Sequence, residues 1–295
     1  MNSITRINSE CIKCLLGKYL KNFPDNIDEE TKIQYMQKVL SIIAAADKRM
    51  SAPELTEKIL TLQKELLGYS TDYSAIKSHF NSLVMSIEGE IEEKINSSTD
   101  KFKTALLYAM SGNFIDFGAM ESVDEESLFE TLDNAENIEI NKTEVENLRQ
   151  EIINAKNLVY LTDNCGEIVL DKLFIKIIKK FNPKIKVDVI VRGQTVLNDC
   201  TIEDAKEIDM YSVADVISNG TAVAGTCLNR ISIEAKNLID TADIIISKGQ
   251  GNFETLHHCS KNIYYLFLCK CKMFAERFDV KQFSGIIIND LRIKF

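Results

Sequence analysis

The sequence predicts an α/β protein, namely a parallel-rich three-layer α/β/α domain that follows an all-helical subdomain. Two observations lead to this fold. Beyond residue 156, short β-rich apolar runs alternate with helical segments, as is typical of parallel strands that helices cover on both faces. Before residue 155, apolar residues recur at spacings of three and four, and strand-like alternation is scarce. We therefore expect a helical subdomain over residues 1–155 and an α/β domain over residues 156–295.

Local signals set the boundaries of individual elements. In the helical half, Ser51 and Glu54 are three residues apart, which predicts a capping box at a helix start, and Gly68 predicts the end of the same helix. In the second half the apolar runs are short and β-rich. The predicted strands are 158–161, 185–191, 215–217, 244–247, 263–268 and 285–288.

Composition excludes several classes of protein. The 295 residues are 45% hydrophobic and 27% charged, as in an ordinary globular protein. No run approaches the roughly 18 apolar residues of a membrane span, and the first ten residues do not resemble a signal peptide. The net charge is −9, without the basic stripe that nucleic acid requires. We expect a cytoplasmic protein that binds neither membrane nor nucleic acid, with reduced cysteines.

Polar residues cluster directly after the first four predicted strands. The carboxyl ends of parallel strands meet at one edge of the sheet, where α/β proteins place their sites. Asp163, Asn164 and Asp199 offer the oxygen donors that Mg²⁺ or Mn²⁺ prefers. The four clusters contain Asp163, Asn164, Gly166 and Glu167; Arg192, Gly193, Asn198 and Asp199; Ser218, Asn219, Gly220 and Thr221; and Lys248, Gly249, Gln250, Gly251 and Asn252.

Positive charge and small residues complete this inventory. Arg192 and Lys248 supply cations for a phosphate, and the glycines let backbone N–H groups approach an anion closely. Taken singly, each cluster also fits a turn, a helix cap or a flexible loop. Neither the P-loop nor the dinucleotide-binding fingerprint is present. The recurrence of such clusters after successive strands favours phosphoryl transfer at a metal site.

The clusters lie in longer strings that follow one another in a defined order. They are Leu-Thr-Asp163-Asn164-Cys-Gly166-Glu167, Val-Arg192-Gly193-Gln-Thr-Val-Leu-Asn198-Asp199, Ile-Ser-Asn219-Gly220-Thr221 and Ser-Lys248-Gly249-Gln-Gly251-Asn252, with Cys11-x-x-Cys14 and Gly112-Asn113-x-x-Asp116 in the helical half. Together they resemble the domain-of-unknown-function eighty-nine family of metal-dependent, damage-control phosphatases, in its prokaryotic branch. The resemblance covers nearly the whole chain.

The resemblance implies roles for individual residues. Asp163, Asn164 and Asp199 would hold one divalent cation, which is Mn²⁺, Mg²⁺, Co²⁺ or Ni²⁺. Asn113 and Asp116 would close over the site from the helical half, and Lys248 would face the phosphate. The residues expected to bind substrate or phosphate are Asn113, Asp116, Glu167, Arg192, Asn219, Gly220, Gly249 and Asn252, and those expected to be catalytic are Asp163, Asp199 and Lys248.

The expected reaction is hydrolysis of a small phosphorylated metabolite, in a damage-control or house-cleaning role. We expect metal-activated water to attack, with Asp199 or Glu167 as base, because an Asp163 that coordinates metal is a poor nucleophile. Two alternatives stay open. One is an S-adenosylmethionine-dependent carboxyl methyltransferase, although the Asp163–Gly166 turn is a poor cofactor loop. The other is a non-catalytic protein that binds a metal or a metabolite.

Cysteine and histidine have competing interpretations. Cys11 and Cys14, with Cys269 and Cys271, could bind zinc or an iron–sulfur cluster, but the spacing of the second pair is poor for zinc. We expect buried, reduced thiols that pack as small apolar residues. The histidines are His79, His257 and His258, and we expect the adjacent pair to lie on a helix surface.

Overall fold

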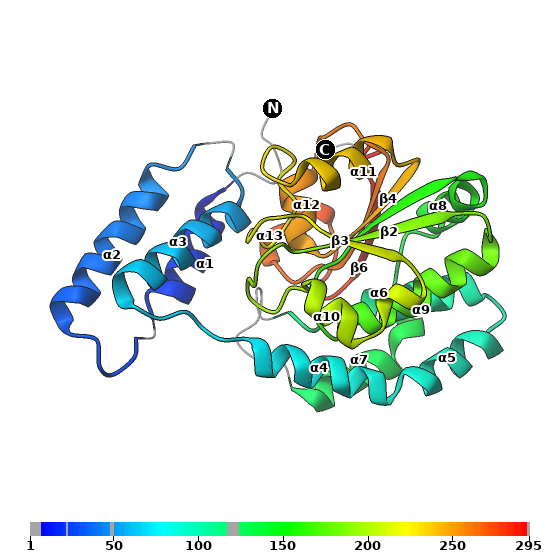
Figure 1. Ribbon diagram of the computed structural model, residues 1–295, viewed down its shortest axis with the longest axis horizontal. Helices are drawn as coiled ribbons and strands as arrows, with labels where there is room; N and C mark the ends of the chain where they lie inside the picture. The colour runs from blue at the N-terminus through cyan, green and yellow to red at the C-terminus, as the bar shows by residue number, and fades with distance from the viewer. Residues whose placement is uncertain (1–6, 22, 48–49, 117–123, 294–295) are drawn as a thin grey trace.

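The computed structural model describes residues 7–21, 23–47, 50–116 and 124–293. A six-stranded sheet forms its centre, with strand order β3-β2-β1-β4-β5-β6 (Figure 1). Neighbouring strands pair in parallel from β3 to β5, and β6 runs antiparallel to β5. The strands are β1 Asn157–Leu161, β2 Lys186–Val191, β3 Asp215–Ser218, β4 Ile244–Lys248, β5 Ile263–Leu268 and β6 Gly285–Asn289. The predicted α/β class is confirmed, and all six predicted runs are strands.

Helices cover both faces of the sheet. Side chains alternate along each strand, so Tyr160 joins the core on one face while Val159 and Leu161 join the core on the other. One face is covered by α4 Ser74–Ser86, α5 Glu88–Ser97, α6 Lys101–Gly112, α7 Glu125–Asp133, α8 Lys142–Asn154, α9 Glu167–Phe181 and α10 Ile202–Glu207. The other is covered by α11 Ile233–Thr241, α12 Gln250–Leu256 and α13 Lys272–Phe278.

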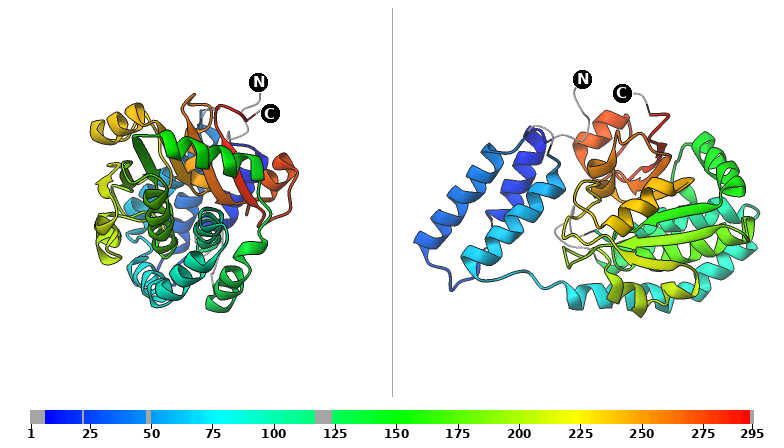
Figure 2. Two further views of the ribbon diagram at one scale, coloured as in Figure 1. Left: turned by 90° about the vertical axis from the view of Figure 1, so that its right-hand side faces the viewer. Right: turned by 45° about the horizontal axis from the view of Figure 1, so that its top comes forward.

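Three N-terminal helices form a separate unit, which we call the cap. They are α1 Ser9–Tyr19, α2 Glu29–Ala44 and α3 Ala52–Leu67, and Figures 1 and 2 show them together beside the sheet. Leu15, Tyr35 and Leu55 belong to their own small hydrophobic core. In contrast, α4–α8 share the core of the sheet. The hydrophobic cores therefore divide between α3 and α4, whereas the predicted subdomain boundary at residue 155 lies inside the core of the larger body.

Local signals in the cap act as predicted. Ser51 and Glu54 form a capping box at the start of α3, where Glu54 accepts hydrogen bonds from the Ser51 amide (2.9 Å) and hydroxyl (2.8 Å). Gly68 ends α3 with φ of 71°, a left-handed conformation that favours glycine. Within the described ranges, no helix is long and apolar enough to cross a membrane.

Candidate active site

Two loops at the carboxyl ends of β1 and β2 are joined by backbone hydrogen bonds. The Cys165 amide donates to Asn198 (2.9 Å) and the Cys200 amide donates to Asp163 (2.8 Å), and Asn164 pairs with Asp199 in an isolated antiparallel bridge. These contacts fix the backbone of the first loop against that of the second. The same contacts bring Asp163 and Asn164 close to Asp199, which lies 36 residues after Asp163 in the sequence.

Arg192 forms hydrogen bonds with the carboxylates of both Asp163 and Asp199. Its Nε donates to Asp199 Oδ2 (2.6 Å), and its Nη2 donates to Asp163 Oδ1 at the longer distance of 3.4 Å. Its Nη1 donates to Asn252 Oδ1 (3.1 Å), which also accepts from the Thr226 hydroxyl (2.8 Å). The Arg192 side chain is only 1% exposed. It is therefore a buried bridge between the two aspartates.

Two amides fix the opposite side of Asp163. Nδ2 of Asn113, at the end of α6, donates to Asp163 Oδ2 (3.1 Å) and to Glu167 Oε2 (3.0 Å). Asn164 Nδ2 donates to the same two atoms, at 2.8 and 3.0 Å. Asn113 is in turn oriented by the Leu268 amide, which donates to its Oδ1 (3.1 Å). The structure thus places Asn113, predicted only through the family resemblance, in contact with the predicted metal ligand Asp163.

Lys248 belongs to a buried ionic cluster that includes Glu167. Its Nζ is 2.6 Å from Glu167 Oε1, 2.6 Å from Asp171 Oδ1 and 2.8 Å from the Ala109 carbonyl oxygen. The Tyr160 hydroxyl also donates to Asp171 (2.7 Å). Burial lowers the pKa of Lys248, but the carboxylates outweigh burial and leave that pKa raised, whereas burial raises the pKa of Asp171 to about 7. The ammonium thus contacts both Glu167 and Asp171 and is fully buried, and the expected role of Lys248 toward a phosphate stays a prediction.

The remaining predicted residues shape the loops. At Gly249, φ is 81°, and a Cβ built there would lie 2.0 Å from Asp163 Oδ2, so only glycine leaves room for that carboxylate. Asn252 Nδ2 donates to the Thr162 (3.0 Å) and Lys248 (2.7 Å) carbonyls, which joins the loops after β1 and β4. Asn219 accepts from the Gly193 amide (3.0 Å) and orders its own turn, which Gly220 continues with φ of 78°.

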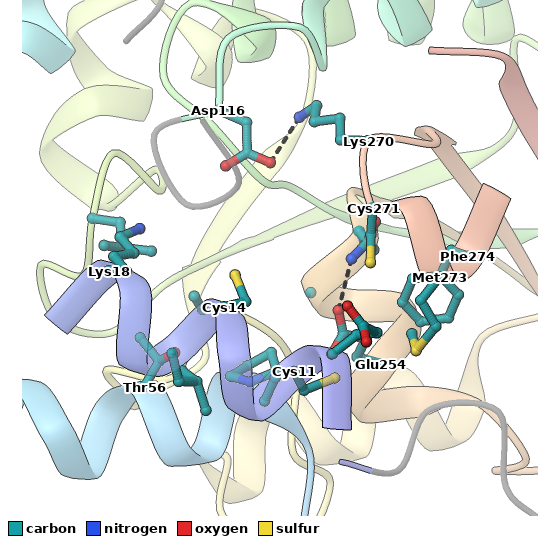
Figure 3. Close-up of a pocket in the computed structure, with 18 of the residues that line it drawn as sticks. Cys11, Cys14, Lys18, Thr56, Asp116, Glu254, Lys270, Cys271, Met273 and Phe274 are labelled. Atoms are coloured by element: carbon teal, nitrogen blue, oxygen red, sulfur yellow. Dashed lines mark hydrogen bonds and ion pairs between the residues drawn. The ribbon is translucent and has the colours of Figure 1, made fainter. Parts of the chain in front are cut away.

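A cavity of about 660 Å³ opens between this rim and the cap (Figure 3). Asp163, Asn164 and Asp199 line it from the body, as does Asp116, which pairs with Lys270 at 2.7 Å. The cap and the far wall contribute basic, sulfur and apolar side chains. They include Cys11, Cys14, Lys18, Tyr19, Pro53, Cys271, Met273 and Phe274, and the far wall also carries the acid Glu254.

The rim concentrates negative charge in a buried place. Burial is the largest influence on Asp163 and raises the pKa of that carboxyl well above its usual range, and Asp199, Glu167 and Asp116 raise it further. Burial likewise raises the pKa of Asp199 to about 6, although Arg192 opposes the shift. Asn164 donates through its Nδ2, and among the described residues no hydrogen bond to its Oδ1 is seen. Two carboxylates and one amide oxygen in an acidic cavity wall fit a hard divalent cation.

Three contributors to this region were missed as site residues. Asp171 and Tyr160 complete the environment of Lys248. Asp171 lies four residues after Glu167, and this spacing on a helix was an available signal. Lys270 follows β5, so extending the survey of strand ends to the fifth strand would have found it.

The cysteine and histidine expectations need correction. All eight cysteines are free, as expected, and Cys269 is buried, but Cys14 is exposed; Cys11 and Cys271 are only half-buried, although they pack against a hydrophobic core. His257 is not a surface residue either, because its side chain is fully buried and its Nδ1 lies 3.1 Å from Asp290 Oδ1. The sequence pattern alone could not show that Asp290, 33 residues later, supplies a partner.

Fold and site together define a parallel α/β protein with an acidic cavity wall beside a helical cap. The chain belongs to the damage-control phosphatase ARMT1-like domain family, which matches residues 7–286. This confirms the family expected from the motifs.

Relatives and solved structures agree with this assignment. A damage-control phosphatase of Archaeoglobus fulgidus is 32% identical, over 98% of this chain and 99% of the relative. A damage-control phosphatase of Pyrococcus horikoshii is 26% identical, over 93% and 95%. A solved DUF89 family protein from Pyrococcus horikoshii has a TM-score of 0.79 at 24% identity, over 97% and 99% of the two chains, and it supports the fold. The named relatives support a house-cleaning phosphatase role.

Proposed function

We propose that this chain is a divalent-metal-dependent phosphomonoesterase that acts on small phosphorylated metabolites. The observation that carries the proposal is the acidic cavity wall, where Asp163 and Asp199 share one buried guanidinium and face the cavity with Asp116. A divalent cation offsets such repulsion and would be held by the two carboxylates and by Asn164. When bound, it would polarise a phosphate oxygen and acidify water.

The surrounding residues provide positioning and proton transfer. Water adds to phosphorus, the ester P–O bond breaks, and the leaving oxygen takes a proton. Asp163 is unsuited as the nucleophile because Asn113, Asn164 and Arg192 all bind its carboxylate. Of the two expected bases, Asp199 lines the cavity, whereas Glu167 is fully buried and bound to Lys248. We therefore assign proton acceptance from water to Asp199 and positioning of the rim to Glu167 and Lys248.

Metal removal tests the proposal directly. Release of inorganic phosphate is measured from a panel of phosphorylated metabolites, before and after chelation, with Mn²⁺, Mg²⁺, Co²⁺ or Ni²⁺ added back. We expect turnover to disappear on chelation and to return with at least one cation. Asp199→Asn should lower kcat by about 10²–10³-fold or more.

A matched control separates this effect from a general loss of negative charge. Asp243 precedes β4 at the amino-terminal ends of the parallel strands, away from the rim. It accepts hydrogen bonds from the Lys156 (2.7 Å) and Asn157 (2.9 Å) amides. Asp243→Asn should leave kcat within about twofold. Hydrolysis that persists at full rate after chelation would overturn the proposed metal dependence.

A further inference from the structure

The two cations that were expected to meet a phosphate are already engaged by carboxylates. Arg192 is 1% exposed and bound to Asp199, and Lys248 is fully buried and bound to Glu167 and Asp171. Neither is among the described residues that line the cavity. A phosphate monoester brings up to two negative charges to a wall that is itself acidic. A cation from another part of the chain would reduce that repulsion.

Helix α1 of the cap carries such a cation. Cys11, Cys14 and Lys18 follow one another at spacings of three and four, so they share one face of α1, and all three line the cavity. Figure 3 shows Cys11 and Lys18 toward opposite ends of this face, with Cys14 between them. The cavity that receives Lys18 is the one lined by Asp163 and Asp199.

The electrostatic environment of Lys18 is consistent with this placement. Burial is the largest influence and lowers the pKa of its ammonium, while the charges of Asp116, Cys14 and Asp199 raise it. The placement itself rests on the cavity, which Lys18 lines from the cap while Asp116 and Asp199 line it from the body.

We propose that Lys18 binds the substrate phosphate, so that the cap completes a phosphate site whose other half is the metal-binding rim of the body. This rests on the proposed phosphatase function. Asp163, Asn164 and Asp199 would hold the divalent cation on the body side of the cavity, and Lys18 would supply positive charge to the phosphate from the cap side. Substrate binding then depends on the cap as well as on the body.

The test compares Lys18→Met with Lys13→Met. Lys13 is on the same helix and also lines the cavity, but its side chain is 72% exposed and pairs with Glu10 (2.7 Å). The readouts are KM, the inhibition constant of inorganic phosphate at saturating Mn²⁺, and Mn²⁺ affinity. We expect Lys18→Met to weaken phosphate binding by about 10- to 100-fold, as loss of a charge-assisted hydrogen bond does. Lys13→Met should change it by less than about twofold, and Mn²⁺ affinity should be unchanged.

A conservative variant and a direct binding measurement complete the test. Lys18→Arg keeps the positive charge and should retain most of the phosphate affinity that Lys18→Met loses. If Lys18 had only a structural role, the phosphate affinity would not follow the charge. Lys18→Gln, which preserves helix propensity, replaces Lys18→Met if circular dichroism shows that the methionine variant is unfolded. Phosphate inhibition constants that match between the Lys18 and Lys13 variants would overturn the proposal.

Failure of the proposed function has a different signature. Calorimetry with inorganic phosphate and Mn²⁺ measures binding without turnover. A wild-type protein that binds phosphate through Lys18 but hydrolyses no ester would remove the phosphatase proposal and keep the phosphate site. An active phosphatase with Lys18→Met at wild-type phosphate affinity would do the reverse.

Discussion

The body and the cap hold their parts of the cavity in different ways. The body fixes its charged groups by buried contacts that span four strand ends, such as Arg192 between Asp163 and Asp199. The cap has a separate small core, and its contacts with the body include the pair of Arg230 with Glu57 at 2.6 and 2.9 Å. Changes in the body should therefore affect both stability and catalysis, whereas changes in the cap should mainly affect binding.

The largest effect is expected in the buried cluster of the body. Lys248→Met removes a cation that contacts both Glu167 and Asp171. Breaking a buried ion pair on one side typically costs about 3–5 kcal/mol in the free energy of unfolding. We also expect kcat to fall by about 10²–10³-fold, because Glu167 would lose its orientation. Urea unfolding and steady-state kinetics measure the two effects.

A compensating variant sharpens this result. Lys248→Met combined with Asp171→Asn removes one of the two stranded carboxylates, so part of the lost stability should return. If Lys248→Met alone has the same free energy of unfolding as the wild type, the cluster does not depend on buried ion pairs. The proposed difference between the body and the cap would then be wrong.

A smaller effect is expected from added volume at Gly249. A Cβ there would lie 2.0 Å from Asp163 Oδ2, at a φ of 81° that non-glycine residues rarely adopt. Gly249→Ala should cost about 1–3 kcal/mol and displace Asp163, which weakens Mn²⁺ binding in calorimetry. Gly89→Ala is the matched control, since nothing lies within 4 Å of the position that its methyl group would occupy, and its place in α5 favours alanine. Equal Mn²⁺ affinity in both variants would show that the Asp163 loop accommodates the methyl group.

The body also contains a buried acid away from the rim, which should affect stability without affecting turnover. Asp290 accepts hydrogen bonds from the His258 (3.0 Å) and Ser260 (3.2 Å) amides and from the Tyr265 hydroxyl (3.1 Å). Burial alone would raise its pKa, but His257 and the amides outweigh burial and lower the pKa below the ordinary 3.8. Asp290→Asn should cost about 1–3 kcal/mol at pH 7.

The sign of this shift sets the pH dependence. A carboxyl whose folded pKa is lowered stabilises the fold above its unfolded pKa, and loses that contribution as the pH falls through the folded value. The stability difference between wild type and Asp290→Asn should therefore shrink below about pH 4. Thermal unfolding from pH 3 to 7 measures it, and a difference that grows on acidification would contradict the lowered pKa.

The sequence predicted the body more completely than the cap, for physical reasons. Local apolar runs predict the strands, and the carboxyl ends of parallel strands lie at the same side of a sheet. Asp163 and Asp199, which follow two such strands, could therefore be placed at one rim. Whether a lysine faces solvent, substrate or a carboxylate depends on three-dimensional neighbours. The sequence therefore could not show that Glu167 and Asp171 bind Lys248, and nothing local in α1 marks Lys18 as a cavity residue.

The smallest effect on stability is expected where the cap meets the body. Glu57 on α3 pairs with Arg230, whose side chain is 37% exposed, so solvent screens the interaction and Glu57→Gln should cost only about 0–1 kcal/mol. If the cap supplies a phosphate-binding group, loosening this contact should still raise KM several-fold while kcat at saturation changes little. Glu90→Gln is the control for loss of a charge. It removes an exposed ion pair with Lys94, in which both residues belong to the body, and should leave KM unchanged. An identical KM in both variants would mean that other contacts, such as that between Asn8 and Met273, keep the cap seated without the Glu57 pair.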